Sequence, residues 1–64
     1  MSHTRELAYR YQNGLEVTLL WNAESNAVSI EVVDELDDQA FVLGVDARVA
    51  LDAFYHPYAY ALAA

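Results

Sequence analysis

The apolar stretch at residues 15–21, entered through the turn Gln12-Asn13-Gly14, constrains the fold more than any other part of the chain. Alternate residues of a β-strand point to opposite faces of its sheet. The odd-numbered residues of this stretch are all apolar, whereas Glu16 and Thr18 occupy even-numbered positions. The stretch therefore predicts a strand with one face toward a core and the other toward solvent.

Three further segments, 6–12, 27–34 and 39–45, show the same alternation, and turn-forming residues separate the last two from their neighbours. Pairing Trp21 with Val28 continues the apolar face through all the later strands in a single register. The sequence predicts an α+β domain with a four-stranded antiparallel β-meander, its strands at about 6–12, 15–21, 27–34 and 39–45. The predicted inner face consists of Leu7, Tyr9, Tyr11, Leu15, Val17, Leu19, Trp21, Val28, Ile30, Val32, Phe41, Leu43 and Val45.

Two turn geometries compete for the first hairpin. A two-residue turn, Asn13-Gly14, would place Tyr11 opposite Glu16 and mix apolar with polar side chains on each face. A three-residue turn that begins one residue earlier would place Tyr11 opposite Leu15 and keep one face apolar. We favour the three-residue turn, because a shift of one residue moves every side chain of a strand to the opposite face.

The period of the pattern changes after residue 45. Asp46 is a good N-cap for a helix over residues 47–55, and Pro57 ends it by disfavouring the helical conformation of the residue before it. On this helix we expect an i,i+4 ion pair between Arg48 and Asp52. The predicted buried face consists of Ala47, Ala50, Leu51, Phe54 and Tyr55.

Residues 58–64 form either a second short helix or an extended aromatic tail, because seven residues rich in Ala favour helix but are marginal alone. Four strands make a face about 15–20 Å wide, of which one helix covers only about 10 Å. The tail or a second copy of the chain must therefore complete the cover. Since a single domain of 64 residues has a thin core, we expect a homodimer with C2 symmetry.

The charge balance restricts the partners. Ten acidic residues against three arginines and no lysine give a net charge of −7, so binding to nucleic acid is not expected. The first interpretation of the acidic surface is that it keeps the protein soluble, and such a surface would also suit a basic protein partner. The chain has no cysteine, no apolar run long enough to span a membrane and no basic segment near its N-terminus. We therefore expect a soluble cytoplasmic protein that makes no membrane contact.

No residue set supports catalysis or a cofactor. The acidic segment 34–38 lacks the spacing and the central glycine of an EF-hand loop, and a solvated turn explains it better than a metal site. His3 and His56 do not have the spacing of zinc ligands. No serine lies in a G-x-S-x-G setting, and no glycine-rich phosphate loop is present. We expect a protein that is not an enzyme and that holds neither metal nor cofactor.

The residues that remain for a function are aromatic. We expect an interface or pocket among Trp21, Phe54, Tyr55, His56, Tyr58 and Tyr60. The favoured function is a small acidic accessory protein that acts through protein–protein contacts as a homodimer. The alternative is a small-ligand binding module with an aromatic pocket between the sheet and the C-terminal segment. An enzyme that uses His56 with an acidic partner ranks last.

Phe54 to Ala61 read F-x-H-P-Y-A-Y-A, and a single Trp lies in the second predicted strand. In these features the chain resembles a group of small uncharacterised proteins from high-GC bacteria. The similarity covers roughly residues 17–61. It implies a bacterial source and a C-terminal segment that is a defined structural element, and it implies no activity.

Overall fold

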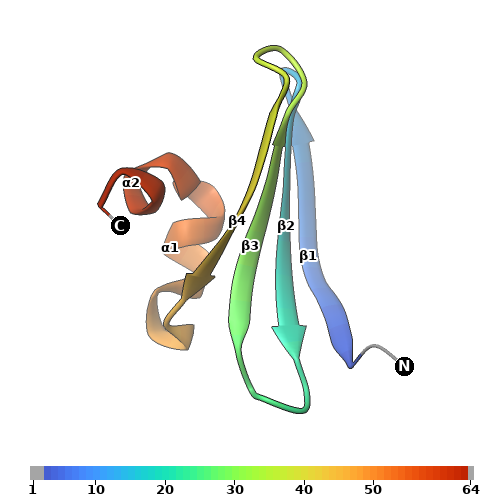
Figure 1. The fold of residues 1–64 in the computed structure, drawn as a ribbon, viewed down its shortest axis with the longest axis vertical. Helices are drawn as coiled ribbons and strands as arrows, with labels where there is room; N and C mark the ends of the chain where they lie inside the picture. Colours follow the sequence, from blue (N-terminus) through green and yellow to red (C-terminus); the bar gives the residue numbers. More distant parts are fainter. Residues whose placement is uncertain (1–2, 64) are drawn as a thin grey trace.

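The computed structural model describes residues 3–63. Four strands form one antiparallel sheet in the order β1-β2-β3-β4, and three short helical elements follow them (Figure 1). The predicted α+β meander with C-terminal helices is thereby confirmed. The elements are β1 (Thr4–Gln12), β2 (Leu15–Asn22), β3 (Val28–Asp34), β4 (Gln39–Val45), the 3-10 helix η1 (Ala47–Val49), α1 (Ala50–Tyr55) and α2 (Pro57–Ala63).

The predicted register of β2, β3 and β4 is confirmed. Trp21 lies opposite Val28, and Val17 lies opposite Val32, which in turn lies opposite Phe41. Because the apolar residues of three neighbouring strands coincide, their side chains form continuous rows on one face. This inner face contains the fully buried Val17, Ile30 and Val32.

The predicted register of β1 is wrong. The first hairpin has the two-residue turn, so Tyr11 lies opposite Glu16. Asn13 and Gly14 both have positive φ, 54° and 81°. This conformation fits a type I′ turn, for which Asn-Gly is a favoured sequence because its twist matches that of the two strands.

The change of register by one residue exchanges the two faces of β1. Ala8 and Arg10 lie on the inner face, whereas Tyr9 and Tyr11, predicted to be inside, lie on the outer face and are 50% and 53% exposed. Leu7, also predicted to be inside, lies in a bulge and is 55% exposed. The physical reason is position in the sheet: α1 packs over β2 and β3, so an edge strand gains little by turning its apolar side inward.

The helical segment begins as predicted but follows a different helical phase. The Asp46 carboxylate accepts a hydrogen bond from the backbone N–H of Arg48, which confirms the N-cap. The predicted pair of Arg48 with Asp52 is wrong, because the guanidinium turns back to Asp46 at 3.1 Å. The first turn is 3-10 helix, and its tighter winding rotates the residues that follow. Consequently Leu51 is exposed while Ala53, outside the predicted face, is fully buried.

Of the predicted buried helix face, Ala50 and Phe54 are buried, whereas Ala47 and Tyr55 are exposed. The helix ends before Pro57 as predicted, and the C-terminal segment then forms α2. Tyr60 packs against the core from α2. The core is therefore a single layer of side chains between the inner face and the helices, with Val17, Leu19, Ile30, Val32, Ala50, Ala53 and Phe54 at its centre.

Candidate functional site

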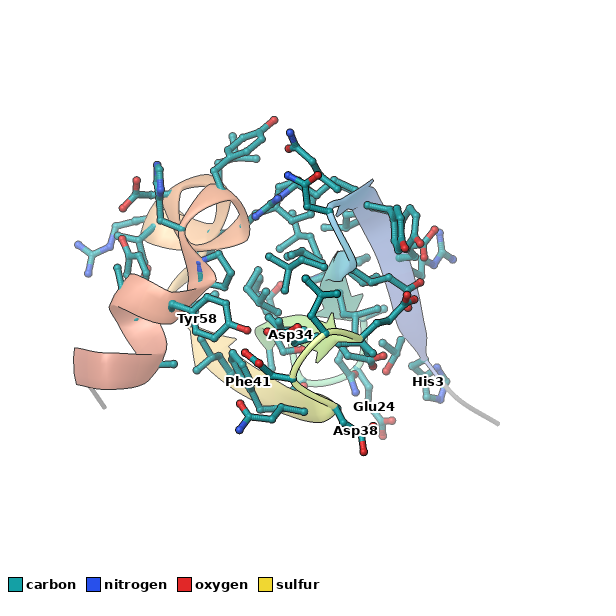
Figure 2. The ribbon with its side chains drawn as sticks, turned by 90° about the horizontal axis from the view of Figure 1, so that it is seen from above. His3, Glu24, Asp34, Asp38, Phe41 and Tyr58 are labelled. Carbon is teal, nitrogen blue, oxygen red and sulfur yellow. The ribbon has the colours of Figure 1, made fainter. Side chains whose placement is uncertain are left out.

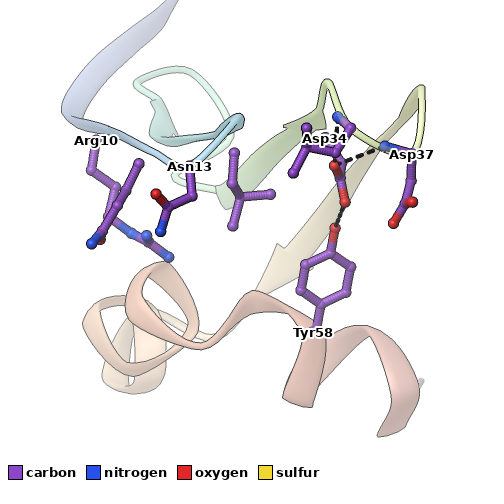
Figure 3. Close-up of a pocket in the computed structure, with 8 residues that line it drawn as sticks. Arg10, Asn13, Asp34, Asp37 and Tyr58 are labelled. Carbon is purple, nitrogen blue, oxygen red and sulfur yellow. Dashed lines mark hydrogen bonds between the residues drawn. The ribbon is translucent and has the colours of Figure 1, made fainter.

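The helices leave part of the inner face open at the end of the sheet that carries the two hairpin turns. An open pocket of about 390 Å³ lies there between the turns and α2 (Figure 3). We call it the turn pocket. Its lining residues come from both hairpins and from α2: Arg10, Gln12, Asn13, Leu15, Asp34, Leu36, Asp37 and Tyr58. Arg10 and Asn13 lie on one side of it, and Asp34, Asp37 and Tyr58 lie on the other (Figure 3).

Contacts between the two turns shape the floor of the pocket. The backbone N–H of Glu35 donates to the carbonyl oxygen of Gly14 at 2.8 Å. The side chain of Leu36 lies across Gly14, so close that a Cβ added there would be 3.0 Å from its Cγ. Because Gly14 has no side chain, the two hairpin tips can approach each other.

Asp34 organises the acidic wall. Its Oδ1 accepts from the backbone N–H groups of Leu36 and Asp37, both at 3.1 Å, and its Oδ2 accepts from the Tyr58 hydroxyl at 3.0 Å. Tyr58 points toward Asp34 and packs edge-on against Phe41, with ring centroids 5.6 Å apart (Figure 2). The carboxylate therefore both stabilises the turn and anchors α2.

These hydrogen bonds favour the ionised carboxylate. The backbone N–H of Asp37 and then the Tyr58 hydroxyl hold the pKa of Asp34 below its ordinary value of 3.8. Burial and the same hydrogen bond raise the pKa of the Tyr58 phenol. At neutral pH the wall is thus anionic and the phenol is a neutral donor.

Arg10 forms the opposite wall. Its Nε donates to the carbonyl oxygen of Phe54 at 3.1 Å, and one Nη donates to that of Tyr55 at 3.3 Å. The guanidinium carbon also lies 5.6 Å and 5.9 Å from the centres of these two rings. A cation is favoured beside the unpaired carbonyls at a helix C-terminus and over aromatic faces. Arg10 is therefore held in place before any ligand arrives.

The outer face of the sheet is the second candidate site. Three cross-strand rows define it, namely Tyr11-Glu16-Val33-Ala40, Tyr9-Thr18-Glu31-Val42 and Glu6-Leu20-Ser29-Gly44. These rows contain three carboxylates and no basic residue. Within residues 3–63 no helix lies on this face, because α1 and α2 cover the inner one (Figures 1 and 2).

The two outer-face tyrosines donate to carboxylates. The Tyr9 hydroxyl lies 2.6 Å from Oε1 of Glu16, and the Tyr11 hydroxyl lies 3.1 Å from Oε2 of Glu35. The bond to Glu16 is the main reason that the pKa of Tyr9 is raised to about 12. A tyrosine held in this way presents a ring of fixed orientation with a negative charge beside it.

The aromatic residues predicted to form a site are spread over the molecule. Trp21 is half-buried, and its indole N–H donates to the side-chain oxygen of Asn26 at 2.8 Å. Phe54 is a core residue, whereas Tyr55 is exposed and packs edge-on against it. Tyr60 is partly buried and donates to a carboxylate oxygen of Asp52.

Only Tyr58 of the predicted set lines the turn pocket. His56 is the exposed C-cap of α1, and its ring has no hydrogen bond or ion pair with another residue of the described part of the chain. The sequence pattern did not predict Arg10, Tyr9 or Tyr11 as site residues. The Asn-Gly dipeptide is the signal that could have found them, because the register it favours puts the tyrosines outside and Arg10 inside.

Within the described part of the chain, no three His, Cys, Asp or Glu side chains are grouped so that they could hold a metal ion. No helix among residues 3–63 has the length and apolar character to cross a membrane.

Fold and sites define a small α+β protein whose open antiparallel sheet has helices on one face, a polar pocket at the hairpin turns and an acidic, tyrosine-bearing outer face. Comparison with protein-family models, with curated proteins and with solved structures finds no match.

Proposed function

We propose that this chain is a small acidic, non-enzymatic interaction protein that binds a basic partner protein through the outer face of its sheet. One observation carries the proposal: both α-helices lie on the inner face, while Tyr9, Tyr11 and Val42 stay at least half exposed on the other. Large apolar side chains that gather on one exposed surface are typical of binding sites, and tyrosine is prominent among interface residues.

The charges of the outer face support a basic partner. Glu16 and Glu31 lie between the exposed rings and Val42, and the cross-strand rows contain no cation. An arginine or lysine of the partner could lie over a tyrosine ring and pair with the glutamate beside it. A second copy would instead bring carboxylates against carboxylates, so the outer face does not suit a face-to-face homodimer.

A homodimer and a cytoplasmic location remain part of the proposal. The dimer would use the helical side, where Leu51 and Tyr55 are both exposed. The solution mass of the wild type and of Leu51→Ser tests this. A dimer that the substitution converts to a monomer supports it, and a monomeric wild type contradicts it.

Partner binding is tested by affinity capture from cells with three baits: the wild type, the double variant Tyr9→Ser/Val42→Ser, and Val49→Ser. Val49 is the control because it is an exposed valine like Val42 but lies on η1, away from the outer face. We expect a basic protein that the wild type and Val49→Ser retain, that the double variant loses, and that added salt releases. Equal capture by all three baits, or no capture, would contradict the proposal.

The turn pocket favours a second candidate function, small-ligand binding. It lies between the sheet and α2 and combines a fixed guanidinium, two carboxylates and two leucines. Its volume falls within the range of about 300–1,000 Å³ that is usual for ligand sites.

A further inference from the structure

We propose that the turn pocket binds a small zwitterion with a carboxylate at one end of an aliphatic chain and an ammonium group at the other. The class includes ω-amino carboxylates and basic amino acids. The inference rests on the second candidate function and gives it a ligand class. It does not depend on protein binding by the outer face.

The cationic side of the pocket fits a carboxylate. An arginine has five N–H donors, and the carbonyl oxygens of Phe54 and Tyr55 take only two of those of Arg10. The structure gives the remaining donors no partner among the described residues. Since the two carbonyls and two aromatic rings already hold the guanidinium, little side-chain entropy is lost when a carboxylate binds it. Asn13 lies on the same side and offers an amide donor (Figure 3).

The opposite side fits an ammonium group. Asp34 and Asp37 carry two carboxylates there, and Asp34 is held in its ionised form by the donors that surround it. An ammonium group has three donors and suits a site with several carboxylate oxygens. The two sides of the pocket therefore have opposite charges, which a ligand with a single charge would satisfy only in part.

The lining of the pocket also includes two aliphatic side chains. Leu15 and Leu36 line it, and Leu36 is 79% exposed although it lies in a strongly acidic turn. One side of Leu36 packs on Gly14, and a methylene chain bound in the pocket would cover part of the side that is left exposed. This feature favours a ligand whose two charges are separated over one in which they are adjacent.

The test is an NMR titration of the intact protein with a series of probes. Glycine, γ-aminobutyrate and ε-aminocaproate increase the separation of the two charges, while caproate and hexylamine each carry only one. We expect ε-aminocaproate to shift the methyl signals of Leu15 and Leu36 and the side-chain amide of Asn13. We also expect it to bind roughly tenfold more tightly than either singly charged probe, the effect of one added charge-assisted contact.

Two matched variants locate the ammonium group. Asp37→Asn removes a charge from the pocket, whereas Asp38→Asn removes the same charge from the neighbouring residue, which does not line it. Asn suits position 38 because Asp38 has a φ of 53°. We expect Asp37→Asn to weaken ε-aminocaproate binding roughly tenfold and Asp38→Asn to change it by less than about twofold.

Arg10→Gln tests the carboxylate contact, and far-UV circular dichroism checks that this variant folds. If Arg10→Gln unfolds, the proposal is tested by the series of probes and by the comparison of Asp37→Asn with Asp38→Asn. Hexylamine binding as tightly as ε-aminocaproate would overturn the zwitterion but keep small-ligand binding. If no probe shifts any signal at about 10 mM, the affinity is too weak for a functional site. That result would overturn both the zwitterion proposal and small-ligand binding. Val42→Ser should leave the titration unchanged, because Val42 lies on the outer face. Ligand binding by the pocket and protein binding by the outer face can therefore succeed or fail independently.

Discussion

The hydroxyl of Tyr58 donates a hydrogen bond to Oδ2 of Asp34 over 3.0 Å and so joins α2 to the end of β3. A helix of seven residues is not stable alone, so its order depends on such contacts. We expect Tyr58→Phe to keep the sheet intact but to speed amide hydrogen exchange in α2 about fivefold, as for loss of one hydrogen bond. Tyr55→Phe is the control, because the Tyr55 hydroxyl has no hydrogen bond to any residue that the structure describes. Equal exchange in both variants would contradict the anchor.

Acid should weaken the same contact. The folded state lowers the pKa of Asp34 below 3.8, so its stabilisation is fully present above the unfolded value and is lost as the pH falls through the folded value. An NMR titration of the side-chain carboxyl should give a midpoint below 3.8 in the wild type. Tyr58→Phe should raise it, but only in part, because the larger contribution comes from the backbone of Asp37. An unchanged midpoint would show that the phenol does not act on the carboxylate.

High pH should remove a stabilising contact of Tyr9, whereas low pH removes that of Asp34. Its pKa rises from 10.0 to about 12 chiefly because Glu16 accepts a hydrogen bond from its hydroxyl, so this stabilisation is present below pH 10.0 and is lost as the pH rises through about 12. The phenolate absorbance of the wild type should show a late-titrating tyrosine. Glu16→Gln keeps an acceptor but removes the charge, and the late component should move toward 10.0. If the two titration curves coincide, the contact with Glu16 is not formed in solution.

The free energy of unfolding of this small domain is low, so it tolerates little loss of packing in the core. Ile30 is fully buried, and Ile→Ala substitutions in cores cost about 2–5 kcal/mol, whereas a domain of this size has only about 3–5 kcal/mol of stability. We expect Ile30→Ala to be largely unfolded by circular dichroism at room temperature, and Ile30→Val to stay folded with a lower urea midpoint. Val42→Ala, on the outer face, should change the midpoint little. A cooperatively folded Ile30→Ala with the wild-type midpoint would contradict this arrangement of the core.

The two glycines should respond differently to alanine. Gly14 has a φ of 81°, and an added Cβ would lie 3.0 Å from Cγ of Leu36. A left-handed conformation costs an alanine about 1–2 kcal/mol, so Gly14→Ala should lower the urea midpoint. Gly44 has open space around it, and Gly44→Ala should be neutral or slightly stabilising. A neutral Gly14→Ala would mean that the hairpin turn differs from the type I′ geometry.

Much of the fold follows from local pattern. The alternation of β2, β3 and β4 defines their register because each strand has one side that is clearly more apolar, and a slip would expose all of it. The Asp46 cap and the helix end before Pro57 follow from backbone chemistry that is independent of the neighbours. The candidate site was less predictable, since of the aromatic residues considered only Tyr58 reaches the turn pocket.

By itself, the sequence determined the order of the elements, two of the three strand-pair registers, the faces of three of the four strands, and the two ends of the first helical segment. The tertiary structure decided between the two turn geometries that the sequence allowed for β1: α1 covers β2 and β3, so the burial available to this edge strand is too small to outweigh the turn preference of Asn13-Gly14. It also decided the use of Arg10, whose partners are carbonyl oxygens 44 and 45 residues away. Such a contact exists only when α1 ends beside β1, and no pattern within one strand can show it.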